Sequence, residues 1–245
     1  MSRLNINYAA YVQGCSFRFL QPQVNPARFQ EFARRLRLSA RTLEILNTKL
    51  PTNEKAMRKR LRELCEIPRM STFAIGAMIN EGINRMVEEH CFVNVGVWHG
   101  FTFLSGLSGN PEKRGIGVDN FSEYGVPRQE FLKDFDKYKS PNHCFYEMDY
   151  VDYFRNVHEG PIGFYIYDGS HDYENQLKGL QLAEPFFARN CIILIDDTNW
   201  PEPRQSTFDF ISQSAYKYRV LLDKTTYANL HPTLWNGIII LQRAD

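Results

Sequence analysis

Two apolar runs that end in acidic residues decide the fold class of this chain: IGFYIYDGSH at residues 162–171 and CIILIDD at residues 191–197. Each run is unbroken and has the length of a single strand. Strands that are apolar on both faces are typical of parallel sheets covered by helices on two sides. The stretch between the two runs, residues 173–187, is long enough for the crossover helix that a parallel connection requires.

Three more short apolar runs precede this pair, and stretches with helical character separate them. The runs cover residues 91–95, 115–118 and 144–148, and the helices between them are expected at 101–107, 128–138 and 151–157. Two late strands are expected at 218–222 and 234–241. Their linker of about a dozen residues has no helical period, which favours antiparallel pairing. The sequence therefore predicts a doubly wound α/β domain over residues 71–245.

Residues 1–70 are expected to form a separate helical extension. Asn25-Pro26 and Pro51-Thr52 have the residue types that begin helices. Residues 26–70 hold twelve Lys and Arg against five Asp and Glu, whereas the remainder of the chain is acidic. Such a surplus usually marks a solvated helical face. The alternative is a docking surface for an acidic partner or for the chain's own acidic part. The extension could serve as a lid, contact the substrate or join copies of the chain in a homo-oligomer.

The overall composition excludes several classes of protein. The 245 residues carry a net charge of +1 and are 43% hydrophobic, which is ordinary for a globular enzyme. This balance gives no general attraction to nucleic acid or to an anionic membrane, so neither is expected as a partner. Five cysteines without a CxxC pair argue against a disulfide framework or a zinc cluster. Without a signal sequence in residues 1–10, the expected location is the cytoplasm.

The loop after the run at 91–95 carries a candidate ligand site. Gly96 and Gly100 would let the backbone turn and approach a ligand at a helix N-terminus, although a plain strand–helix turn explains them equally. Asp119 ends the next strand, where a carboxylate can accept hydrogen bonds from the ribose of an adenosine-type ligand. The GxGxxG pattern that suits the pyrophosphate of NAD is missing.

Acidic residues also end the later strands. Asp149 follows the third strand and could either contact an adenine amino group or cap the next helix. Asp168, Asp196 and Asp197 should converge if their strands are neighbours, because adjacent strands lie about 4.8 Å apart. Clustered carboxylates repel one another unless a cation neutralises them, and oxygen ligands favour Mg²⁺ over zinc. The alternative is that one or two of these acids cap helices or bind loop backbone.

These motifs come in an order that resembles a known family. The runs NVGVWHGFT at 94–102, VD at 118–119, MD at 148–149, DGSHDY at 168–173 and LIDD at 194–197 are similar to those of class I S-adenosylmethionine-dependent methyltransferases. The branch of macrocin-type and catechol-type O-methyltransferases is the most similar. The resemblance implies a Rossmann-like seven-stranded sheet of order 3-2-1-4-5-7-6, with strand 7 antiparallel. It also implies S-adenosylmethionine as cofactor.

The resemblance assigns roles to particular residues. Those implied to bind the cofactor are Asn94, Gly96, Gly100, Asp119, Asp149 and Asp168. Those implied to hold a divalent cation, Mg²⁺ or a similar ion, are Asp168, Asp196 and Asp197. His171 stands where catechol-type enzymes keep their general base, so His171 and Asp168 are the implied catalytic residues. Asn94 departs from the family, which usually has an acid there, and it cannot pair ionically with the amino group of the cofactor.

The sequence thus predicts an S-adenosylmethionine-dependent methyltransferase that uses a metal to assist O-methylation of a small-molecule hydroxyl. His171 would suit the base because an unperturbed histidine has a pKa of about 6.5. Two alternatives remain: a non-catalytic scaffold that binds S-adenosylmethionine, and an NAD-dependent dehydrogenase. Residues 1–70, 122–126 and 200–206 are expected to shape the substrate pocket, although none of them has a readable pattern.

Overall fold

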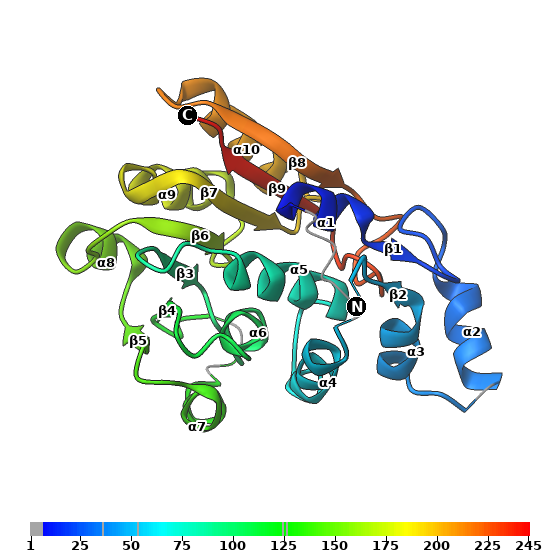
Figure 1. Cartoon of the computed structure of the whole chain (residues 1–245). Coiled ribbons are helices and arrows are strands. Elements are labelled where there is room, and N and C mark those ends of the chain that lie inside the picture. The colour runs from blue at the N-terminus through cyan, green and yellow to red at the C-terminus, as the bar shows by residue number, and fades with distance from the viewer. Residues whose placement is uncertain (1–6, 36, 53, 124, 126) are drawn as a thin grey trace.

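A computed structural model describes residues 7–35, 37–52, 54–123, 125 and 127–245 of the chain. Its centre is a seven-stranded sheet of order β5-β4-β3-β6-β7-β9-β8 (Figure 1). The strands are β3 (Cys91–Val95), β4 (Arg114–Asp119), β5 (His143–Glu147), β6 (Ile162–Tyr167), β7 (Phe187–Asp196), β8 (Tyr218–Lys224) and β9 (Ile238–Arg243). Five strands are parallel, and β9 runs antiparallel to β7 and β8. The predicted order, with its antiparallel strand, is confirmed.

Helices cover both faces of the sheet, as the unbroken apolar strands predict. One face packs against α5 (Phe73–Asn84), α6 (Phe101–Leu107) and α7 (Arg128–Tyr138). The other packs against α8 (Tyr150–Asn156), α9 (Tyr173–Ala183) and α10 (Pro201–Gln213). A short 3₁₀ helix, Glu184–Phe186, leads into β7. Within β6 the side chains alternate between the two cores, because successive residues of a strand point to opposite faces.

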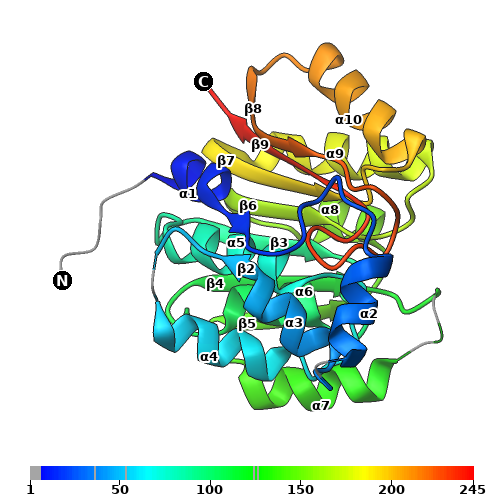
Figure 2. The same ribbon diagram turned by 90° about the vertical axis from the view of Figure 1, so that its right-hand side faces the viewer.

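The N-terminal extension lies against the domain and shares its core. Its elements are α1 (Tyr8–Gly14), β1 (Ser16–Phe17), α2 (Ala27–Arg35), α3 (Ala40–Asn47), β2 (Thr48–Lys49) and α4 (Lys55–Leu64). Tyr8 and Tyr11 are buried, and the Tyr8 hydroxyl donates to the carbonyl of Met78 in α5 at 3.1 Å. Figure 2 shows α2, α3 and α4 across the end of the sheet toward which the parallel strands point. No helix in the described ranges has both the length and the apolarity to cross a membrane.

Two helices, α3 and α10, lack a visible signal in the sequence. The buried face of α10 consists of Pro203, Ser206, Thr207 and Phe210, so it shows no apolar stripe. In α3 the buried residues include Glu44 and Asn47 between apolar neighbours. The last strand also begins at Ile238 rather than 234, because the preceding residues form turns. Polar residues that make tertiary contacts account for these differences.

The register of the sheet places the ends of β3, β4, β6 and β7 side by side. Tyr167 pairs with Ile195 and also with Val95, so Asp168 and Asp196 follow at the same edge of two adjacent strands. The predicted adjacency and parallel direction of these strands are therefore confirmed. Such an edge, outside the carboxyl ends of parallel strands, is where open α/β sheets bind their ligands.

Candidate functional site

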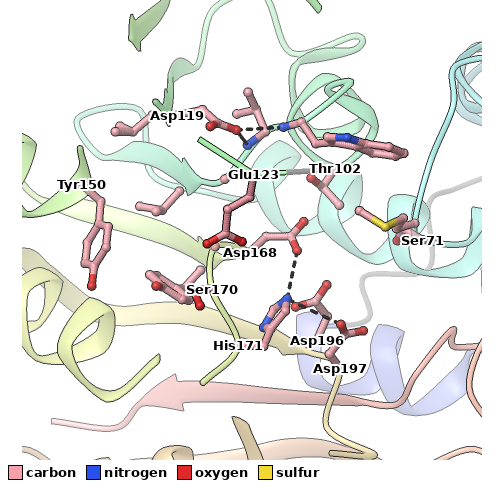
Figure 3. A pocket seen from close by; sticks show the side chains of 18 of the residues that line it. Ser71, Thr102, Asp119, Glu123, Tyr150, Asp168, Ser170, His171, Asp196 and Asp197 are labelled. Carbon is pink, nitrogen blue, oxygen red and sulfur yellow. Dashed lines mark hydrogen bonds and ion pairs between the residues drawn. The ribbon is translucent and has the colours of Figure 1, made fainter. Parts of the chain in front are cut away.

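A cavity of about 350 Å³ opens at this edge of the sheet (Figure 3). Its volume is within the range of small-molecule sites, about 300–1,000 Å³. The predicted site residues that line it are Gly96, Asp119, Asp149, Asp168, His171, Asp196 and Asp197. Asn94 and Gly100 are not among the described residues of its wall. The structure therefore brings most of the candidates together around one space.

The glycine loop lies directly against the end of β6. A Cβ atom on Gly96 would lie 1.9 Å from the carbonyl oxygen of Asp168, and the φ angle of Gly96 is +76°. The Asp168 amide donates to the carbonyl of Val95 at 2.8 Å, which fixes this approach. Gly100 has a φ of +96°, and a Cβ there would lie 2.8 Å from the ring of Phe131. Contacts within the chain thus require both glycines, whatever they do for a ligand.

Asp119 holds the glycine loop in place. Its Oδ2 accepts hydrogen bonds from the amides of Val97 at 2.8 Å and Trp98 at 3.0 Å, and its Oδ1 accepts from the amide of Phe121 at 2.7 Å. A carboxylate has about four lone-pair sites, so three are already occupied. The contact with a ribose stays a prediction, and organising the loop is a role of Asp119 that the sequence did not reveal.

Asn94 and Asp149 also make local contacts. The Asn94 amide nitrogen donates to the carbonyl of Gly96 at 2.7 Å, and its buried Oδ1 has no hydrogen-bond partner among the described residues. Asp149 caps α8 by accepting a hydrogen bond from the amide of Val151 at 2.8 Å. The helix-capping role that the sequence left open for Asp149 is therefore confirmed. Asp149 also lines the cavity, and its contact with an adenine group stays a prediction.

Asp168, His171 and Asp196 form a compact cluster at the floor of the cavity. One ligand atom from each lies within 4.8 Å of the others. Nε2 of His171 lies 3.6 Å from Oδ1 of Asp168 and 3.5 Å from Oδ2 of Asp197. Asp196 is only 5% exposed, and its Oδ1 has no hydrogen-bond partner among the described residues. The cluster holds more negative charge than its own contacts neutralise.

The pKa values of the cluster show this excess. Burial raises the pKa of Asp168, and burial together with the charge of Asp168 raises that of Asp196 well above its ordinary value. Burial and the charge of Asp196 raise the pKa of Asp197 to about 7. Burial alone would lower the pKa of His171, but a hydrogen bond to Asp168 and the neighbouring carboxylates raise it to about 10.

The neighbouring carboxylates thus favour the protonated form of His171, and a protonated imidazole cannot accept a proton. The unperturbed value of about 6.5, from which the sequence made His171 a base, does not apply here. A base role requires that another cation first neutralise the surrounding acids. The base assignment stays a prediction with this added condition.

Asp197, beside the cluster, is hydrogen-bonded to a residue that the sequence did not reveal. Its Oδ1 accepts from the side-chain amide of Asn236 at 2.8 Å, and its φ is +53°. Asp197 is not part of the compact group of ligand atoms, whereas His171 is. Asn236 lies 39 residues further along the chain, in a loop before β9. Only the folded structure shows that this loop contacts the acids.

Residues with strained backbone conformations and aromatic side chains are common in the wall of the cavity. Trp98, Phe121, Asp197, Leu230 and Trp235 all line it and all have φ between +47° and +60°, a region that side-chain-bearing residues rarely adopt. Such conformations persist only where the surroundings impose them, and they cluster at functional sites. The three tryptophans of the chain, Trp200 included, lie in this wall.

The segments expected to shape the pocket contribute unequally. The loop after Asp119 supplies Ser122 and Glu123, and the Glu123 side chain points toward Asp168 (Figure 3). Tyr124 and Val126 lie outside the described residues. Of residues 200–206, only Trp200 lines this cavity, because the others belong to α10.

The extension supplies Arg69 and Met70 to the wall. The described ion pairs of residues 26–70 all join partners within that range. The described ion pairs therefore do not support docking of this basic segment on the chain's own acidic part.

Residues 93–198 match the family model of a methyltransferase domain. The matched range covers less than half of the 245 residues of the chain. It spans β3 to β7 and contains the glycine loop, Asp119 and the compact cluster. The match and the sheet order confirm the resemblance to class I methyltransferases.

Several solved structures share the fold of this chain. Cofactor-bound Rv0187 from MTB has a TM-score of 0.56 at 13% identity, over 91% of this chain and 99% of that one. The O-methyltransferase TomG from Streptomyces achromogenes, in complex with SAM, has a TM-score of 0.55 at 8% identity, over 79% and 92%. An O-methyltransferase from Bacillus cereus, in complex with SAH, has a TM-score of 0.51 at 12% identity, over 79% and 92%. No curated protein sequence matches the chain.

Proposed function

We propose that the chain is an S-adenosylmethionine-dependent O-methyltransferase that acts on a hydroxyl group of a small molecule, with a divalent cation at the compact cluster. The observation that carries the proposal is the cluster of Asp168, His171 and Asp196 beside the glycine loop, at the ends of two adjacent parallel strands. An adenosine-type cofactor and a hard cation would meet at this point.

The charge of the cavity wall suits S-adenosylmethionine. Six carboxylates line it, while Arg69 is the only arginine or lysine among the described residues of its wall. That surplus favours a ligand with a sulfonium and an ammonium group. Asp149 and Tyr150 would adjoin the adenine end, Asp119 the ribose, and Gly96 and Asp168 the methionine end. The solved structures of TomG and of the Bacillus cereus enzyme carry SAM and SAH, which supports this assignment.

The compact cluster also fits a divalent cation. It offers oxygen and imidazole ligands, and the buried Oδ1 of Asp196 lacks a hydrogen-bond partner among the described residues. The pKa values of its two acids and of the adjacent Asp197 are raised, which is the signature of carboxylates that lack a compensating charge. Asp168 and Asp196 would hold the ion, with Asp197 as a further ligand, which leaves His171 free to act as the base. A bound cation of this kind lowers the pKa of an adjacent hydroxyl.

S-adenosylmethionine supplies a methyl group on a positively charged sulfur. In the transfer the acceptor oxygen forms a bond to the methyl carbon, the carbon–sulfur bond breaks, and the hydroxyl proton leaves to a base. The chain would contribute by orientation, because the glycine loop, Asp168 and the three tryptophans all line the cavity that would enclose the reacting atoms. His171, beside Asp168 and Asp197, is the group placed to receive the proton once the local charge is neutralised.

Methyl transfer from labelled S-adenosylmethionine to a panel of small hydroxyl compounds tests the proposal. Activity should require Mg²⁺ or Mn²⁺ and should be lost in EDTA. Asp196→Asn should lose activity more strongly than Asn199→Ala, since a carboxylate is the better ligand for a hard cation. Full activity in EDTA would remove the cation from the proposal. Methyl transfer to amines but not to hydroxyls would show that the acceptor is an amino group rather than a hydroxyl group.

A small acceptor and a cytoplasmic location complete the proposal. The cavity has the size of a small-molecule site. All five cysteines lie in the described ranges and are unpaired, which agrees with a reducing compartment.

A further inference from the structure

The chain between α4 and α5 forms part of the cavity wall. Arg69, Met70 and Ser71, here called the rim segment, all line the cavity, as does Thr102 of α6 (Figure 3). The guanidinium of Arg69 lies 5.2 Å from the ring centre of Phe101, the first residue of the helix that follows the glycine loop. The position of the rim segment therefore affects the shape of the cavity beside that loop.

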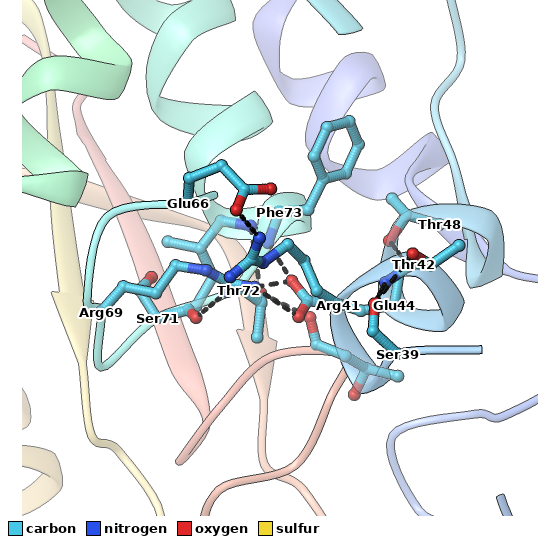
Figure 4. Close-up of polar contacts among 12 residues, drawn as sticks. Ser39, Arg41, Thr42, Glu44, Thr48, Glu66, Arg69, Ser71, Thr72 and Phe73 are labelled. Atoms are coloured by element: carbon cyan, nitrogen blue, oxygen red, sulfur yellow. Dashed lines mark hydrogen bonds and ion pairs between the residues drawn. The ribbon is translucent and has the colours of Figure 1, made fainter. Parts of the chain in front are cut away.

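One residue of the N-terminal extension holds this segment. Glu44, in α3, accepts hydrogen bonds from both terminal nitrogens of Arg69, at 3.1 Å to Oε1 and 2.8 Å to Oε2 (Figure 4). The same Arg69 also donates to the carbonyl of Ser71 at 2.5 Å. This bidentate geometry fixes the plane of the guanidinium as well as its position. Arg69 thus joins its own segment to α3.

Glu44 also fixes the start of α5. Its Oε1 accepts from the amide of Phe73 at 2.5 Å, the first residue of that helix. Thr72, the helix cap, donates from its hydroxyl to the carbonyl of Thr233 at 2.8 Å. The rim segment is therefore held at both ends, by Arg69 at one and by Phe73 at the other. A helix N-terminus stabilises a carboxylate, which adds to the attraction of Arg69.

The pair is buried, so its loss would rearrange the rim. The side chains of Arg69 and Glu44 are 12% and 8% exposed. Removing one partner of a buried ion pair leaves the other charge uncompensated, and the free partner must then move toward water. A shift of Arg69 toward water would alter its contacts with Phe101 and with the carbonyl of Ser71. That movement would displace the rim segment from the cavity wall.

We propose that Glu44 is a positioning residue of the cofactor cavity, which it shapes through Arg69 and the amide of Phe73. The N-terminal extension is then part of the site, although none of residues 1–68 lines the cavity among those described. The inference rests on the proposed function only in taking S-adenosylmethionine as the ligand.

The chain provides a matched control for this ion pair. Arg41 of α3 pairs with Glu66, close to the first pair and in the same region of the extension (Figure 4). These side chains are 38% and 68% exposed, and neither residue lines the cavity. Glu66→Gln removes the same charge and keeps the same shape as Glu44→Gln, but Glu66 is exposed and its described ion pair is with Arg41 rather than with the rim segment.

The test measures binding of S-adenosylmethionine by calorimetry and by tryptophan fluorescence, since all three tryptophans line the cavity. Binding is measured well below the thermal midpoint of each variant, with near-ultraviolet circular dichroism to verify folding. Glu44→Gln should lower the affinity by about tenfold or more, because it leaves Arg69 buried and unpaired. Glu66→Gln should stay within about twofold of the wild type, because an exposed pair contributes little.

A double variant separates positioning from plain stability. Glu44→Gln with Arg69→Met leaves no unpaired charge, so the thermal midpoint should recover toward that of the wild type while the affinity stays low. Should Glu44→Gln not fold, Glu44→Asp keeps the charge with a shorter reach, and its affinity should fall between those of the wild type and the double variant. Wild-type affinity in folded Glu44→Gln, or recovery of affinity in the double variant, would overturn the inference. A wild-type protein that does not bind S-adenosylmethionine would instead overturn the proposed function, and this inference with it.

Discussion

Replacing Gly96 by alanine tests how closely the glycine loop and the end of β6 depend on each other. The new Cβ would lie 1.9 Å from the carbonyl oxygen of Asp168, a backbone atom that cannot move alone. The φ of +76° adds a left-handed penalty of roughly 1–2 kcal/mol. Forcing a methyl group into a closed space adds about 1–3 kcal/mol, and a backbone neighbour places the cost at the upper end. The variant should lose about 3–5 kcal/mol of unfolding free energy.

Gly160→Ala is the matched control. Gly160 has a φ of +87°, and a Cβ added there would meet only Nη1 of Arg114, at an ordinary 3.4 Å. It therefore carries the left-handed penalty of about 1–2 kcal/mol without the close approach. Urea unfolding followed by circular dichroism gives both free energies. If Gly96→Ala destabilises the chain no more than Gly160→Ala does, the loop has room to move and the inferred close packing against Asp168 is wrong.

Three further outcomes follow from individual contacts. Asp196→Asn should weaken Mg²⁺ binding in calorimetry by about 10-fold or more, because it removes a buried carboxylate ligand; unchanged Mg²⁺ affinity would exclude Asp196 as a ligand. Asn236→Ala should raise the pKa of Asp197 above its value of about 7, because its hydrogen bond to the charged form is lost; carbon-detected NMR titration would measure this. Burial lowers the pKa of His158 to about 4, so the unfolded chain binds more protons between about pH 4 and 6.5. The stability from His158 is complete above about pH 6.5 and is lost as the pH falls toward 4, by about 1–2 kcal/mol between pH 7.5 and 5. His158→Gln should show a correspondingly smaller loss in urea unfolding at these two values, and an equal loss would contradict the assignment.

The sequence predicts the parts of the fold that depend on local pattern. The runs 162–167 and 191–195 are apolar throughout, so their burial in a parallel sheet follows from composition alone. Because parallel strands end at one edge, the meeting of Asp168 and Asp196 could also be predicted. Helices whose buried face is polar are not predicted, because they lack an apolar period. The buried face of α10 includes Ser206 and Thr207, and that of α3 includes Glu44 and Asn47.

Contacts between residues distant in the sequence could not be predicted either. Asn236 reaches Asp197, and Glu44 reaches Arg69 and Phe73, only because the fold brings their loops and helices together. His171 shows the same limit in its charge. Its position three residues after Asp168 can be read from the sequence, whereas its raised pKa depends on carboxylates from two strands. Residue type and spacing thus locate the site, and tertiary contacts set its electrostatics.

Calorimetric titration of the purified chain with S-adenosylmethionine, and with NAD in parallel, tests the central claim most directly. The cavity with its glycine loop, Asp119 and six carboxylates should bind S-adenosylmethionine with a dissociation constant in the micromolar range, roughly −8 kcal/mol. NAD should not bind, because its pyrophosphate would face this acidic wall. Binding of NAD without binding of S-adenosylmethionine would contradict the account.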